Sequence, residues 1–213
     1  MRGKICFIKD LSLNEITMDK KEITKRKLQA IKSKEYIYRI SRELINKNGF
    51  DNVKVKDICK KAGVSVGTFY HYFSSKEAIF YEVYKIADDY FKDEVSKLLV
   101  QENFADRIIF FFRIYAKYNI NQGLEATSQL YNSKNKLFIA KGRYMHILLE
   151  KIIKEGQEKN EIKDEMSPED LADYLFIMAR GIVYTWLLHD GDYDLENKMV
   201  EYLKRLLIVF INL

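Results

Sequence analysis

"KKAGVSVGTFYHYFSSKEAIF", residues Lys60 to Phe80, contains the most informative pattern in this chain. Within it, Gly63 to Gly67 has the pattern G-x-S-x-G, which surrounds the nucleophile of many hydrolases. The same residues also suit the tight turn and second helix of a helix-turn-helix. Ser65 would be a nucleophile in the first case and a helix N-cap facing DNA in the second.

The segment before Ser65 favours the helix-turn-helix. A nucleophile elbow needs a buried strand ahead of the serine, because the sharp strand-to-helix turn lifts the hydroxyl above a sheet. Residues 55–63, VKDICKKAG, instead have apolar residues at the spacing of a short amphipathic helix. No local motif selects a base from the three histidines, His71, His146 and His189. A serine hydrolase using residues 63–67 is therefore kept only as an alternative.

Each position of the motif has a place in a helix-turn-helix. Gly63 can adopt the positive φ of a turn between packed helices, and Ser65 can cap the next helix. Phe69 and Phe73 share one face, which would hold that helix against the domain. Outward-facing hydroxyls and a valine suit phosphates, base edges and a thymine methyl. The residues predicted to face outward are Val66, Gly67, Thr68, Tyr70 and His71. Lys76 is expected to begin the following helix, where the helix dipole and the ammonium both favour a phosphate.

Composition indicates a helical protein with a substantial core. The 213 residues are 47% hydrophobic and 31% charged, with a single proline. No apolar run approaches the ~20 residues of a membrane span, and the first 15 residues carry charges where a signal peptide is apolar. We therefore expect a cytoplasmic protein that does not bind a membrane. Two cysteines, Cys6 and Cys59, are too few for a disulfide framework or a cysteine zinc site, and we expect no cofactor and no metal.

The net charge of +5 is unevenly distributed. Residues 1–76 contain 18 Lys or Arg and 8 Asp or Glu, for a charge of +10, whereas residues 77–213 contain 18 and 23, for −5. A basic N-terminal third indicates an anionic partner at one end of the protein. A merely solvated lysine-rich face is the alternative.

Periodicity predicts helices throughout and no strand. The expected helices are Thr24–Asn48, Val55–Ala62, one capped by Ser65, a connecting helix from Lys76 to Val95, Ala105–Asn121, Lys136–Lys159, Pro168–His189 and Leu195–Ile211. The fold class is therefore all-α. We divide the chain into an unassigned extension (1–22), in which Met18 is a candidate start, a helix-turn-helix DNA-binding domain (23–75), and a larger helical domain for effector binding and dimerisation (76–213).

The stretch "VKVKDICKKAGVSVGTFYHYFSSKEAIF" closely resembles the DNA-binding signature of the tetracycline-repressor (TetR) family. The resemblance runs from about Ile37 to Phe80. It implies a homodimeric transcriptional regulator, most often a repressor, with three N-terminal DNA-binding helices. It also implies a helical domain that binds an inducer and dimerises, usually through a four-helix bundle of the last two long helices.

Carried over by position, the resemblance places Ser65, Gly67, Thr68, Tyr70 and His71 at DNA contacts and Lys76 at a phosphate. Two departures from the family pattern affect the expected operator preference. Val53-Lys54 replaces the usual N-cap Thr or Ser, although Lys54 could meet a phosphate directly. Val66 stands where a polar or basic residue is common. Cys59 replaces a usual alanine and is expected to be a buried small apolar residue.

The last two predicted helices have wide apolar surfaces that must be buried. "LADYLFIMARGIVYTWLLHDG" resembles the penultimate helix of such regulators, and small residues in it allow close helix packing. We favour a dimer interface over an intrachain core. Its predicted residues are Ala179, Gly181, Ile182, Trp186, Leu203, Leu206, Leu207 and Phe210.

The 15 tyrosines and 13 phenylalanines suggest an aromatic effector cavity. Tyrosine hydroxyls would orient a flat or lipophilic effector there, although most of these aromatics are expected in plain core. The predicted pocket residues are Phe111, Phe112, Tyr115, Tyr118, Tyr144, His146 and Phe176. The function we expect is a ligand-responsive, dimeric regulator, not an enzyme, released from a palindromic operator by a small effector. A helical interaction module without an operator remains the other alternative.

Overall fold

The computed structural model describes residues 25–132 and 135–212. The extension 1–22 and the candidate start at Met18 lie outside the described residues. Within them, the chain is helical, and the only β interaction is an isolated antiparallel bridge between Ile162 and Ile211. The all-α prediction is confirmed.

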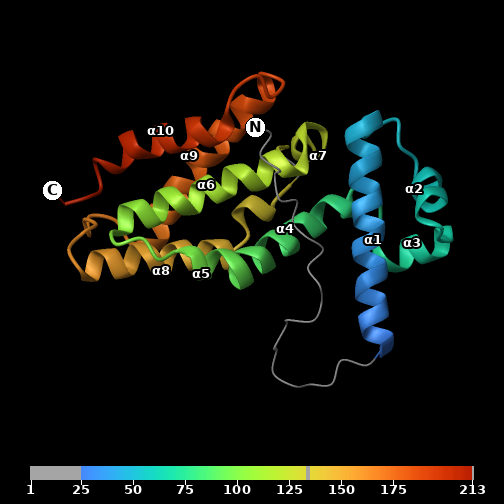
Figure 1. Cartoon of the computed structure of the whole chain (residues 1–213), viewed down its shortest axis with the longest axis horizontal. Coiled ribbons are helices and arrows are strands. Elements are labelled where there is room, and N and C mark those ends of the chain that lie inside the picture. The colour runs from blue at the N-terminus through green and yellow to red at the C-terminus, as the bar shows by residue number, and fades with distance from the viewer. Residues whose placement is uncertain (1–24, 133–134, 213) are drawn as a thin grey trace, which may run out of the picture.

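The N-terminal helices form a compact three-helix unit at one end of the molecule (Figure 1). They are α1 (Lys25–Asn48), α2 (Val55–Ala62) and α3 (Val66–Tyr72). Ile37, Ile45, Ile58 and Phe69 are fully buried in a shared core. Gly63 ends α2 with φ 66°, in the left-handed region that glycine adopts without strain. The predicted turn between α2 and α3 is confirmed.

A continuous helical path connects this unit to the rest of the chain. It comprises α4 (Ala78–Tyr90), a π-helical turn η1 (Phe91–Val95) and the short α5 (Ser96–Leu98). Ile79 and Phe80 are buried in the N-terminal core, whereas Ala87 and Phe91 are buried in the C-terminal core. The two cores therefore share one helix, α4, which leaves the three-helix unit and enters the second domain (Figure 1).

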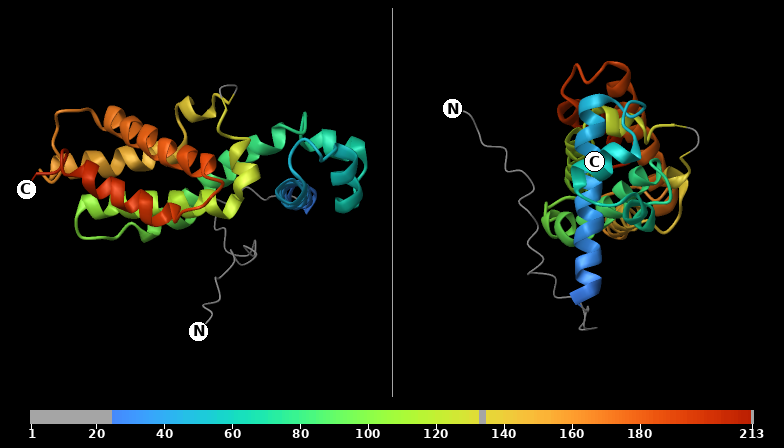
Figure 2. Two further views of the ribbon diagram at one scale, coloured as in Figure 1. Left: turned by 90° about the horizontal axis from the view of Figure 1, so that it is seen from above. Right: turned by 90° about the vertical axis from the view of Figure 1, so that its right-hand side faces the viewer.

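The C-terminal domain is a bundle of long helices. Its elements are α6 (Phe104–Gln122), α7 (Leu124–Ser128), the 3-10 turn η2 (Leu137–Ile139), α8 (Tyr144–Glu158), α9 (Pro168–Leu188) and α10 (Leu195–Leu207). The helix α10 packs along α6 and α9, and α8 packs along α9. The three-helix unit projects from one end of this bundle (Figure 2). As predicted, Ser167 caps α9 by accepting a hydrogen bond from the Asp170 N–H at 3.1 Å.

Three helix predictions differ from the structure. The helix expected from Lys136 begins at Tyr144, because Ala140 is extended and Gly142 has φ 78°. The last helix ends at Leu207 rather than Ile211. The short α7 was not predicted, since five residues are too few to produce a helical period.

The helix α9 is long and apolar enough to cross a membrane on length and composition, and it is the one such helix among the described residues. The expectation that no apolar run approaches that length therefore has this exception. Eight of its residues are buried inside the protein: Leu171, Ala172, Leu175, Phe176, Ala179, Ile182, Val183 and Trp186. The place of these residues in the core accounts for part of the apolar character of α9.

Candidate nucleic-acid interface and effector cavity

The helix α3 presents one face to the core and one to solvent. Phe69 is fully buried, whereas Val66 and Tyr70 are 40% and 52% exposed. Gly67 and His71 are exposed beside them, and Thr68 is half-buried. The structure thus brings these five predicted residues onto one short helix at the surface. Their contacts with DNA stay a prediction.

Ser65 is the N-cap of α3. Its Oγ accepts the Thr68 N–H at 3.0 Å and lies 2.8 Å from Thr68 Oγ1. The element before it is the helix α2, whereas a nucleophile elbow requires a strand there. The capping prediction is confirmed, and the elbow geometry of the hydrolase alternative is absent at residues 63–67.

Lys54 lies at the N-cap of α2 with an exposed side chain that cannot accept a capping hydrogen bond. The Asp57 carboxylate compensates from within the helix, because it accepts the Lys54 N–H at 2.9 Å. The lysine side chain therefore has no capping role and is directed to solvent. Its contact with a DNA phosphate stays a prediction.

Lys76 is positioned differently from the prediction. The helix α4 begins at Ala78, not at Lys76. The Lys76 ammonium donates to the carbonyls of Phe50 at 2.8 Å and Val53 at 3.0 Å, and it lies 3.8 Å from the centroid of the Phe50 ring. Two of its three N–H donors therefore join the segment before α4 to the loop between α1 and α2. Only the third remains for the predicted phosphate contact.

A cavity of about 40 Å³ lies between α4, α6, α8 and α9. Four of the predicted pocket residues line it: Tyr115, Tyr118, His146 and Phe176. Phe111 and Phe112 do not, because they are fully buried in the core, where they pack against Phe176 at ring-centroid distances of 5.9 and 5.3 Å. Tyr144 does not line the cavity either.

Many of the residues that line the cavity were not predicted from the sequence. The additional polar and aromatic lining residues are Tyr84, Asn119, Tyr131, Phe138, Arg143 and Arg180. Tyr84 lies on α4, which the sequence identified only as a connecting helix. Tyr131, Phe138 and Arg143 come from the segment between α7 and α8, which has little helical period to show which side chains point inward.

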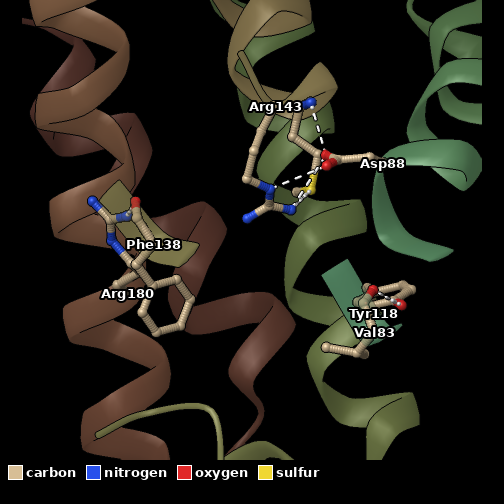
Figure 3. Close-up of polar contacts among 7 residues, drawn as sticks. Val83, Asp88, Tyr118, Phe138, Arg143 and Arg180 are labelled. Atoms are coloured by element: carbon tan, nitrogen blue, oxygen red, sulfur yellow. Dashed lines mark hydrogen bonds and ion pairs between the residues drawn. The ribbon is translucent and has the colours of Figure 1, made fainter. Parts of the chain in front are cut away.

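The two arginines of the cavity have different partners (Figure 3). Arg143 forms a bidentate pair with Asp88 of α4, with Nε–Oδ2 at 3.1 Å and a second N–O distance of 3.2 Å. Arg180 of α9 donates to the Phe138 carbonyl at 2.6 Å, and its guanidinium lies 5.4 Å from the Phe138 ring centroid. Asp88 thus neutralises Arg143, whereas Arg180 has a neutral acceptor.

His146 is a neutral imidazole at the cavity wall. Burial, reinforced by the nearby positive charge of Arg143, lowers its pKa to about 4. Its ring stacks on Phe176 at 4.1 Å, and its Nδ1 has no hydrogen-bond partner in the described part of the chain. Two tyrosine hydroxyls also belong to the wall. The hydroxyl oxygens of Tyr115 and Tyr131 lie 3.1 Å apart, and burial raises the pKa of both groups.

Most of the predicted dimer-interface residues are buried within the single chain. Ala179, Ile182, Trp186, Leu203 and Leu207 are at most 6% exposed. Leu206 and Phe210 are half-buried, and Gly181 is exposed. Burial within the single chain argues against contact of these five with a partner subunit. The sequence could not show this, because α9 and α10 each have apolar residues on more than one side. Among the exposed residues of α9, four large apolar residues and one glycine follow a three-four spacing along the helix: Tyr174, Ile177, Gly181, Tyr184 and Leu188.

Comparison with known proteins agrees with both halves of this architecture. Residues 37–83 match the family model "Bacterial regulatory proteins, tetR family", and residues 122–209 match that of the "YsiA-like protein, C-terminal region". The fold and the exposed helix α3, which follows the turn after α2, define a helix-turn-helix regulator of transcription. The chain belongs to the TetR family of these regulators and is a ligand-responsive DNA-binding protein.

Its relatives include regulators of fatty acid metabolism. The "Fatty acid metabolism regulator protein" of Bacillus subtilis (strain 168) is 31% identical over 174 residues, which cover 76% of this chain and 88% of that protein. The solved structure of FadR from Bacillus subtilis in complex with stearoyl-CoA aligns with a TM-score of 0.66 at 24% identity, over 79% of this chain and 96% of that one. FadR from Bacillus halodurans aligns with a TM-score of 0.67 at 22% identity, over 82% and 94%.

Proposed function

We propose that this chain is a homodimeric repressor that is released from a palindromic operator when a lipophilic effector occupies the cavity. A long-chain acyl-CoA is the first candidate effector. The 31% identical relative is named for fatty acid metabolism, and a structural neighbour holds stearoyl-CoA. By this proposal the protein acts on DNA in the bacterial cytoplasm, and its function requires no enzymatic step.

The observation that carries the proposal is the double role of α4. Val83, Tyr84 and Ala87 line the cavity, whereas Ile79 and Phe80 on the same helix are buried in the core of the three-helix unit. A change in the cavity that displaces α4 therefore displaces the three-helix unit, including α3, as well. An effector shifts this equilibrium only to the extent that it binds one arrangement better than the other.

The size of the cavity supports a change of shape on binding. Ligand sites usually enclose roughly 300–1,000 Å³, and the cavity here has about 40 Å³. A lipophilic effector must therefore separate the surrounding helices, including α4. The conformation described here corresponds by this proposal to the effector-free, DNA-binding state.

The exposed stripe of α9 is the proposed dimer contact. Ile177 is 64% and Leu188 66% exposed, and Tyr202 and Val209 extend the apolar surface onto the neighbouring α10 and the turn after it. Two such surfaces would bury each other in a symmetric interface. Each subunit would then place α3 in one major groove, with half-sites one helical turn (about 34–36 Å) or a multiple apart.

The test is DNA release by acyl-CoAs. Fluorescence anisotropy with the DNA upstream of the protein's own gene should give a salt-dependent, palindrome-selective complex that long-chain acyl-CoAs dissociate and short-chain ones do not. Ala87→Leu should fill the cavity and abolish the response while DNA binding persists. Ala105→Leu, on a half-buried residue of the same domain outside the cavity, is the matched control. DNA binding that no acyl-CoA weakens would reject the effector class.

A further inference from the structure

The cavity has an unbalanced positive charge. Its lining contains two arginines and no aspartate or glutamate among the described residues. Asp88, just outside the lining, neutralises Arg143 through two hydrogen bonds and accepts the Met145 N–H at 3.1 Å as well. Arg180 has no carboxylate within ion-pair distance in the described part of the chain, and its one hydrogen bond goes to a backbone carbonyl. The excess charge of the cavity therefore belongs to Arg180.

Arg180 is half-buried, and two aromatic rings flank its guanidinium. The centroids of Phe138 and Phe176 lie 5.4 and 6.0 Å from its guanidinium carbon. The faces of such rings stabilise a cation, but the rings accept no hydrogen bonds from the N–H groups in the plane of the guanidinium. A guanidinium has five N–H donors in a rigid fork that suits carboxylate and phosphate oxygens. The one bond to Phe138 leaves the other donors for such oxygens.

His146 provides a second unsatisfied group in the same wall. It is buried, stacks on Phe176, and has an Nδ1 without a hydrogen-bond partner in the residues described. An unpaired polar atom in a buried position is costly and is rare in proteins. Phe176 is therefore near two groups that a polar ligand could bond: the remaining donors of Arg180 and the unpaired Nδ1 of His146.

From these contacts we propose that Arg180 binds an anionic group of the effector, and that the effector is an amphipathic anion rather than a neutral lipophile. This inference rests on the proposed function for the use of the cavity as the effector site. The anionic oxygens can come from the carboxylate of a free fatty acid or from the phosphates of an acyl-CoA. The apolar part lies against the tyrosine and phenylalanine rings, and the His146 imidazole bonds a polar atom beside the anion.

The test uses two dyes with the same ring system. 1-Anilinonaphthalene-8-sulfonate is anionic, and N-phenyl-1-naphthylamine lacks the sulfonate. Arg180→Gln should weaken binding of the sulfonate at least tenfold and change binding of the neutral dye less than twofold. Arg180→Lys should restore part of the difference. Arg113→Gln, the same change on α6 beside Glu196 and outside the cavity, should affect neither dye.

The source of the anion is distinguished with stearate, methyl stearate and stearoyl-CoA. Loss of stearate binding in Arg180→Gln identifies a carboxylate, and loss of stearoyl-CoA binding identifies a phosphate. Equal weakening of both dyes, no weakening of either, or no saturable binding of the sulfonate dye overturns the inference. Arg180-dependent dye binding together with DNA that no acyl-CoA releases would reject the proposed effector class and keep the anion site.

Discussion

Asn46 on α1 and Gly123 at the end of α6 are so close that a Cβ atom on Gly123 would lie 2.6 Å from Asn46 Nδ2. The Asn46 side chain forms two hydrogen bonds with the residues around Gly123: its Nδ2 donates to the Gln122 carbonyl at 2.7 Å, and its Oδ1 accepts the Ala126 N–H at 3.1 Å. Gln122 Oε1 in turn accepts from the Tyr38 hydroxyl at 3.0 Å. Besides α4, the junction of α6 and α7 is thus a second connection between the DNA-binding and effector domains.

Gly123→Ala should weaken this connection. Gly123 has φ 87°, so alanine adds backbone strain as well as the contact with Asn46. Gly142→Ala is the control, because Gly142 has φ 78° but a Cβ atom there would meet no described residue within 4 Å other than its two chain neighbours. We expect the control to lower the free energy of unfolding by about 1 kcal/mol and Gly123→Ala to lower it by a further ~1–3 kcal/mol. Urea denaturation measures both values, and an equal decrease in unfolding free energy for the two variants would contradict the steric argument.

Lys76 should contribute to stability as well as to DNA affinity. Lys76→Ala removes two hydrogen bonds from a half-buried ammonium, and we expect a loss of about 1.5–3 kcal/mol in unfolding free energy, accompanied by weaker binding to all DNA sequences.

Lys54→Ala, at an exposed site, should change stability by less than ~0.5 kcal/mol. It should reduce the slope of log K against log salt by about 1, because one phosphate contact is lost. An unchanged salt slope for Lys54→Ala would argue against its phosphate contact.

Ser65 should show both a capping and a DNA-binding role. Ser65→Ala removes the acceptor for the Thr68 N–H and should cost about 1 kcal/mol of stability. Ser65→Asp retains a good N-cap and should cost little, yet it places a negative charge at the predicted DNA backbone and should weaken binding at least tenfold. Thermal unfolding and mobility-shift titrations measure the two effects. If Ser65→Asp binds DNA as tightly as the wild type, Ser65 does not lie at the DNA interface.

His146 should make stability depend on pH. Its pKa in the folded protein, about 4, lies below the ordinary value of 6.5, so between these pH values the unfolded chain binds the proton more readily. Stability attributable to this residue is therefore lost as pH falls from about 6.5 to 4. Relative to His146→Gln, the wild type should lose on the order of 1–2 kcal/mol over this range, after allowance for solvent screening. If the free energies of unfolding of the wild type and His146→Gln change equally with pH over this range, His146 does not contribute in this way.

The local structure of the DNA-binding unit could be predicted from its residues alone. Gly63 and Ser65 act through their own backbone and nearest turns, so a glycine turn and a capping serine could be recognised from residue type and spacing. The apolar period of Val55–Ala62 identified α2 for the same reason, and long amphipathic helices such as α9 were located to within a residue or two.

Which apolar face of a helix is core depends on the packing of the helices and could not be predicted from periodicity. Ile182 and Trp186 match an interface in composition but are buried against their own chain, whereas Ile177 and Leu188 are left outside. Periodicity gives the faces of a helix but not the neighbour that covers each one. Likewise, Lys76 binds the carbonyls of Phe50 and Val53, which lie more than 20 positions earlier. The cavity combines residues of α4, α6, α8 and α9, and this combination depends on how the helices pack rather than on any one segment.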